Sequence, residues 1–126
     1  MVINNNEHTV FVYGSLKRGG RLNHLLNKAD YLGEFKTEDK WGLINLGAFP
    51  GMVYGNLSVE GEAYSVNDDT LDDLDFVEGV QVKMYTRRKI PLLHADGGEA
   101  MSAWVYIYND TPTSIASADK TERWVV

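Results

Sequence analysis

Short apolar runs, separated by small or polar residues, recur along most of this chain. The run over residues 9–13 is continuously apolar, which predicts a strand that is buried on both faces. Similar runs predict four further strands over residues 41–46, 62–66, 85–93 and 101–108. Since short strands of this kind tend to close on themselves or pack beneath a helix, we expect a mainly β fold.

Glycine-rich breaks connect the predicted strands. The sequence GAFPG over residues 47–51 predicts a turn, and HADGGE over residues 94–99 predicts the connection of a hairpin. Beyond residue 109 the chain is polar until Trp124, so we expect a loosely held tail that Trp124 anchors.

Two segments carry helical signals. Leucines at positions 22, 25 and 26, with Ala29, have helical spacing and are followed by Gly33, which predicts a helix over residues 21–31. The second signal is more complete. Asn67 is a good N-cap, two aspartates occupy the first turn, and Gly79 is a natural stop, so a short helix is predicted over residues 68–78.

Composition narrows the class of protein. The chain has 126 residues, of which 44% are hydrophobic, and this indicates a single globular domain over residues 1–126. No apolar run approaches the ~18 residues of a membrane span, and the polar N-terminus lacks the pattern of a signal peptide. The absence of cysteine excludes disulfides and thiolate metal sites, and a cytoplasmic location fits. The net charge of −6 argues against nucleic acid and anionic membranes as partners.

Glu78 is the candidate for acid–base chemistry. With Leu71 and Leu74 it follows the i, i+3, i+7 spacing of one apolar helix face, so the side chain is directed toward the core. Burial and the negative end of the helix dipole would both raise the pKa of this carboxyl. A solvated helix end is the commoner reading of such a glutamate. Either Glu78 or the neighbouring Asp75 could instead cap the helix or form an ion pair, with Arg87 and Arg88 as available partners.

The turn after the first strand is the candidate binding element. Gly14, Ser15 and Leu16 could direct consecutive backbone N–H groups at one carboxylate, and Lys17 with Arg18 would add positive potential. Composition alone favours the alternative, in which Gly-Ser merely ends a strand.

Other chemistry-bearing residues suggest no metal site. The three histidines are scattered without ligand spacing, and aspartates 68, 69, 72 and 73 suit a solvated helix face. Tyr85 follows the Glu78 loop and is a candidate for ligand contact. Core or surface packing is the more frequent role for tyrosines placed like Tyr106 and Tyr108.

Two segments, taken together, resemble a known family. VFVYGSLKRGGRLNHLL near the start and GEAYSVNDDTLDDLDFVEG in the middle are similar to the two sequence blocks of the γ-glutamylcyclotransferase-like family, of the AIG2-like or γ-glutamylamine cyclotransferase type. The resemblance covers residues 8 to about 108 and is nearest to a small bacterial branch of the family. The loop over residues 80–83 departs from it, because it lacks the proline that the family often has there.

The resemblance implies an α+β fold, a small mixed β-barrel with flanking helices. It also implies a cavity between the YGSL turn and the helix-end glutamate, no metal or organic cofactor, and a small substrate that carries a carboxylate. The reaction would be intramolecular: the α-amine of a γ-glutamyl compound attacks its own γ-carbonyl and forms 5-oxoproline. The site residues would be Glu78 for catalysis and Tyr13, Gly14, Ser15, Leu16 and Tyr85 for substrate binding. The alternative is a non-catalytic module that captures a small anionic metabolite or nucleotide fragment.

Overall fold

Seven strands and one α-helix account for most of residues 8–109 and 120–125, the part of the chain that this computed structural model describes. In chain order the elements are β1 (His8–Val12), the 3₁₀ turn η1 (Asn23–Leu26), β2 (Asp30–Thr37), β3 (Trp41–Asn45), β4 (Pro50–Tyr54), β5 (Glu60–Val66), α1 (Asp68–Val77), β6 (Tyr85–Leu93) and β7 (Glu99–Tyr108). No helix within these residues is both long and apolar enough to cross a membrane.

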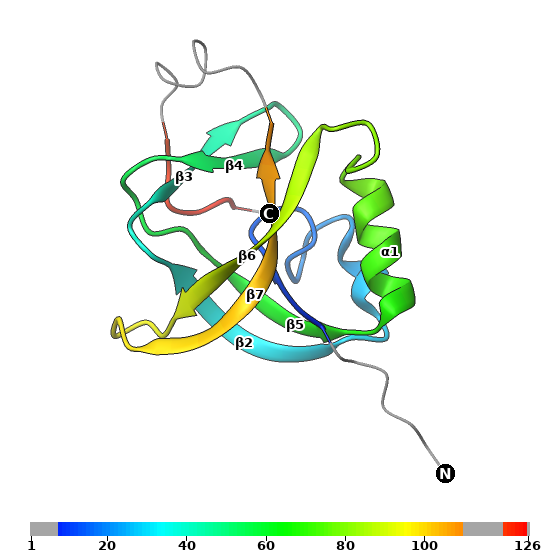
Figure 1. Cartoon of the computed structure of the whole chain (residues 1–126), viewed down its shortest axis with the longest axis horizontal. Helices are drawn as coiled ribbons and strands as arrows, with labels where there is room; N and C mark the ends of the chain where they lie inside the picture. The colour runs from blue at the N-terminus through cyan, green and yellow to red at the C-terminus, as the bar shows by residue number, and fades with distance from the viewer. Residues whose placement is uncertain (1–7, 110–119, 126) are drawn as a thin grey trace.

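Five of the strands close into a barrel. Their order around it is β1, β5, β2, β6 and β7, and β7 pairs back onto β1 where Trp104 lies opposite Val10. That closing pair is parallel, whereas the other neighbours in the ring are antiparallel. The hairpin of β3 and β4 extends the sheet from β7, and α1 lies along one side of the barrel (Figure 1). The expected small mixed β-barrel is therefore confirmed.

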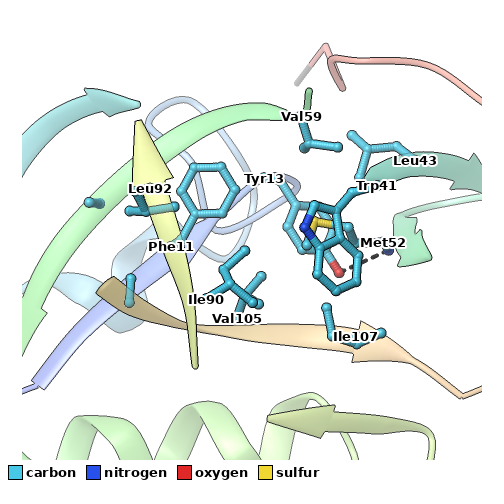
Figure 2. Packing of buried hydrophobic residues seen from close by; sticks show 12 residues of the cluster. Phe11, Tyr13, Trp41, Leu43, Met52, Val59, Ile90, Leu92, Val105 and Ile107 are labelled. Atoms are coloured by element: carbon cyan, nitrogen blue, oxygen red, sulfur yellow. Dashed lines mark hydrogen bonds between the residues drawn. The ribbon is translucent and has the colours of Figure 1, made fainter. Parts of the chain in front are cut away.

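Strand β1 is buried on both faces, as its continuous apolar run predicts. Phe11 belongs to the apolar cluster inside the barrel, together with Met52 and Val105 (Figure 2). Val10 and Val12 point the other way, into a second cluster that α1 covers with Leu71 and Leu74. Because both faces of β1 are packed, the turn that follows the strand starts from a fixed point between the barrel and the helix.

Helix α1 begins and ends where local signals place its limits. The Asn67 side chain accepts a hydrogen bond from the backbone N–H of Thr70 at 2.8 Å. At the other end Gly79 adopts a left-handed conformation with φ of +66°, which glycine tolerates best. The N–H of Gly79 bonds to the carbonyl of Phe76 and that of Val80 to the carbonyl of Asp75, the paired bonds of a Schellman motif. The last residue before that glycine is Glu78, whose backbone is fixed by these bonds.

Loss of the N-cap should destabilise the protein modestly. We expect Asn67→Ala to lower the free energy of unfolding by about 1 kcal/mol, because the N–H of Thr70 loses its acceptor. Urea denaturation measures the change. Asn67→Asp, which keeps a side-chain acceptor, is the control and should stay close to the native value. Equal losses in both variants would show that the side-chain acceptor is not the source of the stabilisation.

The predicted helix over residues 21–31 is wrong. The chain forms only the short turn η1 there and then enters β2, which pairs with β5 from Asp30 onward. The apolar side chains that suggested a helix, Leu22, Leu25 and Ala29, are partly buried against the cluster beneath α1. One turn is enough to bury them, and pairing along β5 then decides the conformation of the rest.

Two strands had no clear signal in the sequence. Strand β2 was hidden by the helical spacing at its start. Strand β4 begins at Pro50, inside the turn predicted over residues 47–51. Proline suits this position because it is the first residue of the strand. The hairpin connection after β6, the N-cap at Asn67 and the positions of the other predicted strands are confirmed, with shifts of one or two residues at some ends.

The predicted tail lies only partly among the described residues. Residues 120–125, called the C-terminal strap here, return to the barrel (Figure 1). Leu43 and Thr121 exchange two backbone hydrogen bonds of 2.9 Å, and the Lys17 ammonium donates to the Trp124 carbonyl at 2.6 Å. Trp124 also packs against the barrel core, so its expected anchoring role is confirmed.

Candidate active site

A cavity of about 350 Å³ lies where the turn after β1 meets the C-terminal end of α1. The six residues singled out from the sequence all line it: Tyr13, Gly14, Ser15, Leu16, Glu78 and Tyr85. Residues some 60 positions apart in the chain therefore meet in one hollow, because β1 and α1 pack against the same apolar cluster.

Glu78 provides the acidic group of this cavity. Burial of the side chain raises its pKa from 4.5 to about 7, the direction predicted from its place on the apolar helix face. Within the described part of the chain no cation or hydrogen-bond donor pairs with the carboxylate. No fully enclosed side-chain oxygen or nitrogen there lacks a partner, so the Glu78 oxygens reach the open space of the cavity. The carboxyl is thus tuned to exchange a proton near neutral pH.

The turn over residues 14–16 forms the facing wall. The N–H groups of Gly14, Ser15 and Leu16 have no acceptor among the described residues, although the Gly14 carbonyl accepts from the N–H of Lys17 at 3.0 Å. A methyl group on Gly14 would come within 2.8 Å of the Pro50 ring, so glycine alone fits this close approach. Unpaired N–H groups on a fixed turn are suitable donors for an anion.

Three buried tyrosines surround Glu78 and keep their protons. The hydroxyls of Tyr13 and Tyr85 donate to the carbonyls of Tyr106 and Pro50, at 2.6 and 3.0 Å. The Tyr106 hydroxyl donates to an Asp75 carboxylate oxygen at 2.7 Å. Burial raises the pKa of each of these three phenols, and the nearby Glu78 charge adds to the rise. Because their hydrogens are already donated, the tyrosines shape the cavity, and Glu78 is left as the candidate proton carrier.

Asp75 ties the last turn of α1 to the barrel. Besides accepting from Tyr106, its carboxylate pairs with the Arg87 guanidinium of β6 at 3.2 Å. Of the roles left open from the sequence, the ion pair with Arg87 is the correct one. Arg88 lies instead over the rings of Trp41 and Tyr54. Asp75 precedes Glu78 by three residues, so this network also holds the helix turn from which Glu78 projects.

The positive charge of the cavity comes from a residue that the sequence reasoning missed. Arg21 lines the cavity, whereas the expected contributors Lys17 and Arg18 line a different hollow of about 630 Å³. There Lys17 is bonded to the Trp124 carbonyl and Arg18 is paired with Glu62. The signal for Arg21 was its place directly after the Gly-Gly pair, but the wrong helix prediction concealed it.

No cluster among the described residues offers a metal three or more histidine or acidic ligands. The aspartates at positions 68, 69, 72 and 73 are exposed on the outer face of α1, as expected.

Comparisons with known proteins bear on the family and the fold. Residues 10–126 match the family described as "Gamma-glutamyl cyclotransferase, AIG2-like". A protein of Vibrio cholerae, named provisionally as a gamma-glutamylcyclotransferase, is 41% identical over 105 residues, covering 83% of this chain and 85% of its own length. The Escherichia coli gamma-glutamylcyclotransferase family protein YtfP is 36% identical over 117 residues, covering 90% and 96%. The crystal structure of a mouse AIG2-like protein superposes with a TM-score of 0.83 over 94% of this chain and 88% of its own, at 24% identity.

Proposed function

Because this chain belongs to the γ-glutamyl cyclotransferase, AIG2-like family, we propose that it releases 5-oxoproline from a γ-glutamyl amine or γ-glutamyl peptide. The observation that supports the proposal is one cavity lined both by Glu78, whose carboxyl has a pKa of about 7, and by residues 14–16, whose N–H groups have no acceptor among the described residues. A proton carrier and an anion-binding wall are the two parts that this cyclisation requires.

In the proposed reaction the α-nitrogen of the substrate forms a bond to its own γ-carbonyl carbon. Glu78 first takes a proton from the α-ammonium, which frees the lone pair for attack. Collapse of the tetrahedral intermediate breaks the bond to the leaving nitrogen, and Glu78 returns the proton to that nitrogen. The α-nitrogen loses a second proton as it becomes the lactam N–H, and this proton passes to the released amine, which leaves as its ammonium form, or to solvent. The products are 5-oxoproline and a free amine, and the carboxylate ends as it began.

The cavity would contribute positioning as much as acid–base chemistry. Nucleophile and electrophile belong to one molecule, so the protein mainly has to hold a folded conformer of it. The N–H groups of Gly14, Ser15 and Leu16 would bind the α-carboxylate or the oxyanion that develops on the γ-carbonyl. A carboxyl with a pKa of about 7 serves both proton transfers at neutral pH, since its two protonation states are then similarly populated.

A substrate panel tests the proposal. The purified protein is incubated with γ-glutamyl amides and γ-glutamyl dipeptides, and 5-oxoproline and the free amine are both quantified. We expect the two products in equal amounts from at least one compound. Saturable binding of these compounds without either product would favour the alternative, a module that captures a small anion.

Arg21 should assist binding of the substrate carboxylate. We expect Arg21→Gln to raise KM about tenfold with little change in kcat, because a partly exposed charge-assisted hydrogen bond holds ground state and transition state alike. Steady-state kinetics on the best compound of the panel measures both constants. Arg88→Gln removes an exposed arginine that lies outside the cavity and serves as the control. An unchanged KM in Arg21→Gln would remove Arg21 from the site.

A further inference from the structure

The lining of the candidate cavity has two chemically different parts. In the first part Leu22 donates its N–H to the Ser15 carbonyl at 3.0 Å, which holds the neighbouring Arg21 close to the turn over residues 14–16. N–H groups without an acceptor among the described residues, together with the Arg21 guanidinium, make this part suitable for a carboxylate.

The lining next to Glu78 in the chain is apolar and open to solvent. Val77 and Met84 line the cavity there, and 42% and 46% of their surfaces remain exposed. A methyl group on Gly79 would lie 3.2 Å from Met84 Cβ and 3.3 Å from Val82 Cγ2, so Met84 and Val82 flank the residue that follows Glu78. Val82 is itself 76% exposed. Apolar side chains thus remain accessible beside the proton carrier, at the end of α1 and in the loop that leads to β6.

Charge is confined to two positions in the cavity. Among the described residues that line it, Arg21 and Glu78 are the two with a charged side chain. The three tyrosine hydroxyls in the lining are neutral and already donate hydrogen bonds. A ligand group that extends past Glu78 toward Val77 and Met84 therefore finds no ionic partner on this wall.

We propose that the wall formed by Val77 and Met84, with Val82 next to it, is a subsite for an apolar leaving amine, so that the substrate class is γ-glutamyl amides of uncharged alkyl or arylalkyl amines. This inference rests on the proposed function, because it takes Glu78 as the residue that protonates the leaving nitrogen. The γ-glutamyl part lies toward the turn and Arg21, the scissile nitrogen lies at Glu78, and the hydrocarbon of the amine covers the exposed wall.

A longer hydrocarbon on the leaving amine should then raise kcat/KM, whereas a charge on it should lower kcat/KM. Each methylene that leaves water against this wall should raise kcat/KM roughly threefold. A terminal charge on the same hydrocarbon chain should lower it by at least about tenfold, because the charge would lose water without gaining a partner.

The test compares three amides of matched length: γ-glutamyl-pentylamide, γ-glutamyl-5-aminopentylamide and γ-glutamyl-5-aminopentanoate. Their leaving groups are neutral, cationic and anionic. We expect the native protein to release 5-oxoproline from the pentylamide with a kcat/KM at least about tenfold above that of either charged compound.

Variants of the wall should change this ranking in opposite ways. Met84→Glu should shift the preference at least about tenfold toward the aminopentylamide, and Val77→Lys should shift it toward the aminopentanoate. Both residues are partly exposed, so the fold should accept the charge. Phe76→Glu is the matched control, since Phe76 is 75% exposed next to Val77 but does not line the cavity.

The failures are distinguishable. If the native protein releases 5-oxoproline from a charged amide as well as from the pentylamide, the apolar subsite is refuted and the proposed function stands. An unchanged ranking in both wall variants refutes the subsite as well. If no amide is cyclised, the proposed function fails, and calorimetry of the same three compounds decides the subsite: tighter binding of the pentylamide supports it, and equal binding overturns it.

Discussion

Replacing Glu78 with glutamine is expected to lower kcat for 5-oxoproline release by about 10²–10⁴-fold, the usual contribution of a positioned acid–base group. Glutamine preserves the size of the side chain but neither accepts nor returns a proton. The helix end should persist, because the Schellman bonds that fix it involve backbone atoms only. Loss of turnover with retained binding would therefore report on proton transfer.

Steady-state kinetics and calorimetry separate these effects. The matched control is Asp72→Asn, which removes an exposed carboxylate from the same helix and should leave kcat unchanged. In the native protein kcat/KM should rise with pH up to about 7, as Glu78 ionises in the free enzyme. A Glu78→Gln protein with full turnover would eliminate Glu78 as the proton carrier.

The same substitution should stabilise the protein at alkaline pH. Glu78 has a pKa of about 7 in the folded protein against 4.5 in the unfolded chain, so between these values the folded state binds more protons. Native stability from this group is then full below pH ~4.5 and declines as pH rises to ~7. The shift corresponds to about 3 kcal/mol. We expect Glu78→Gln to exceed native stability by about this amount at pH 8 and to match it near pH 4.5.

Urea denaturation of both proteins across this pH range measures the difference. The two curves of stability against pH should meet at low pH and diverge as Glu78 ionises. Parallel curves would mean that the carboxylate is adequately solvated in the folded protein, and the basis for its raised pKa would be lost. If Glu78→Gln gains this stability while only the native protein is active, then the buried carboxyl lowers the stability of the native protein in exchange for its activity.

The acidic half of the candidate site could be predicted because its determinants are local. Asn67 and Gly79 set the two ends of α1, and Leu71 and Leu74 set the face that is buried. Those four positions fix the direction of Glu78 without reference to the rest of the chain. The turn after β1 could be predicted equally well, because the apolar run of the strand and the small residues of the turn lie within a few positions of one another.

The cationic part of the site could not be predicted in the same way. Lys17, Arg18 and Arg21 lie on one short loop, and nothing in their spacing distinguishes the one that enters the cavity. Contacts between residues that are distant in sequence decide which cation enters the cavity. Lys17 donates a hydrogen bond to the Trp124 carbonyl, and Arg18 forms an ion pair with Glu62. For the same reason β2 escaped detection, because its pairing with β5 overrides the helical spacing of the leucines before it.

The loop after β1 divides two hollows. Ser15 and Leu16 face the one that contains Glu78, whereas Lys17 and Arg18 face the larger one. The two hollows are separated by this one loop segment. Lys17 bonds to the Trp124 carbonyl of the C-terminal strap, and the Arg18 N–H bonds to the Glu62 carboxylate. We therefore expect this loop segment to act as a fixed wall and not as a flap, so that the proposed N–H donors are in place before any ligand arrives. We also expect the strap to support the turn from a distance, so that a change around Trp124 shifts the N–H groups of residues 14–16 without touching the cavity.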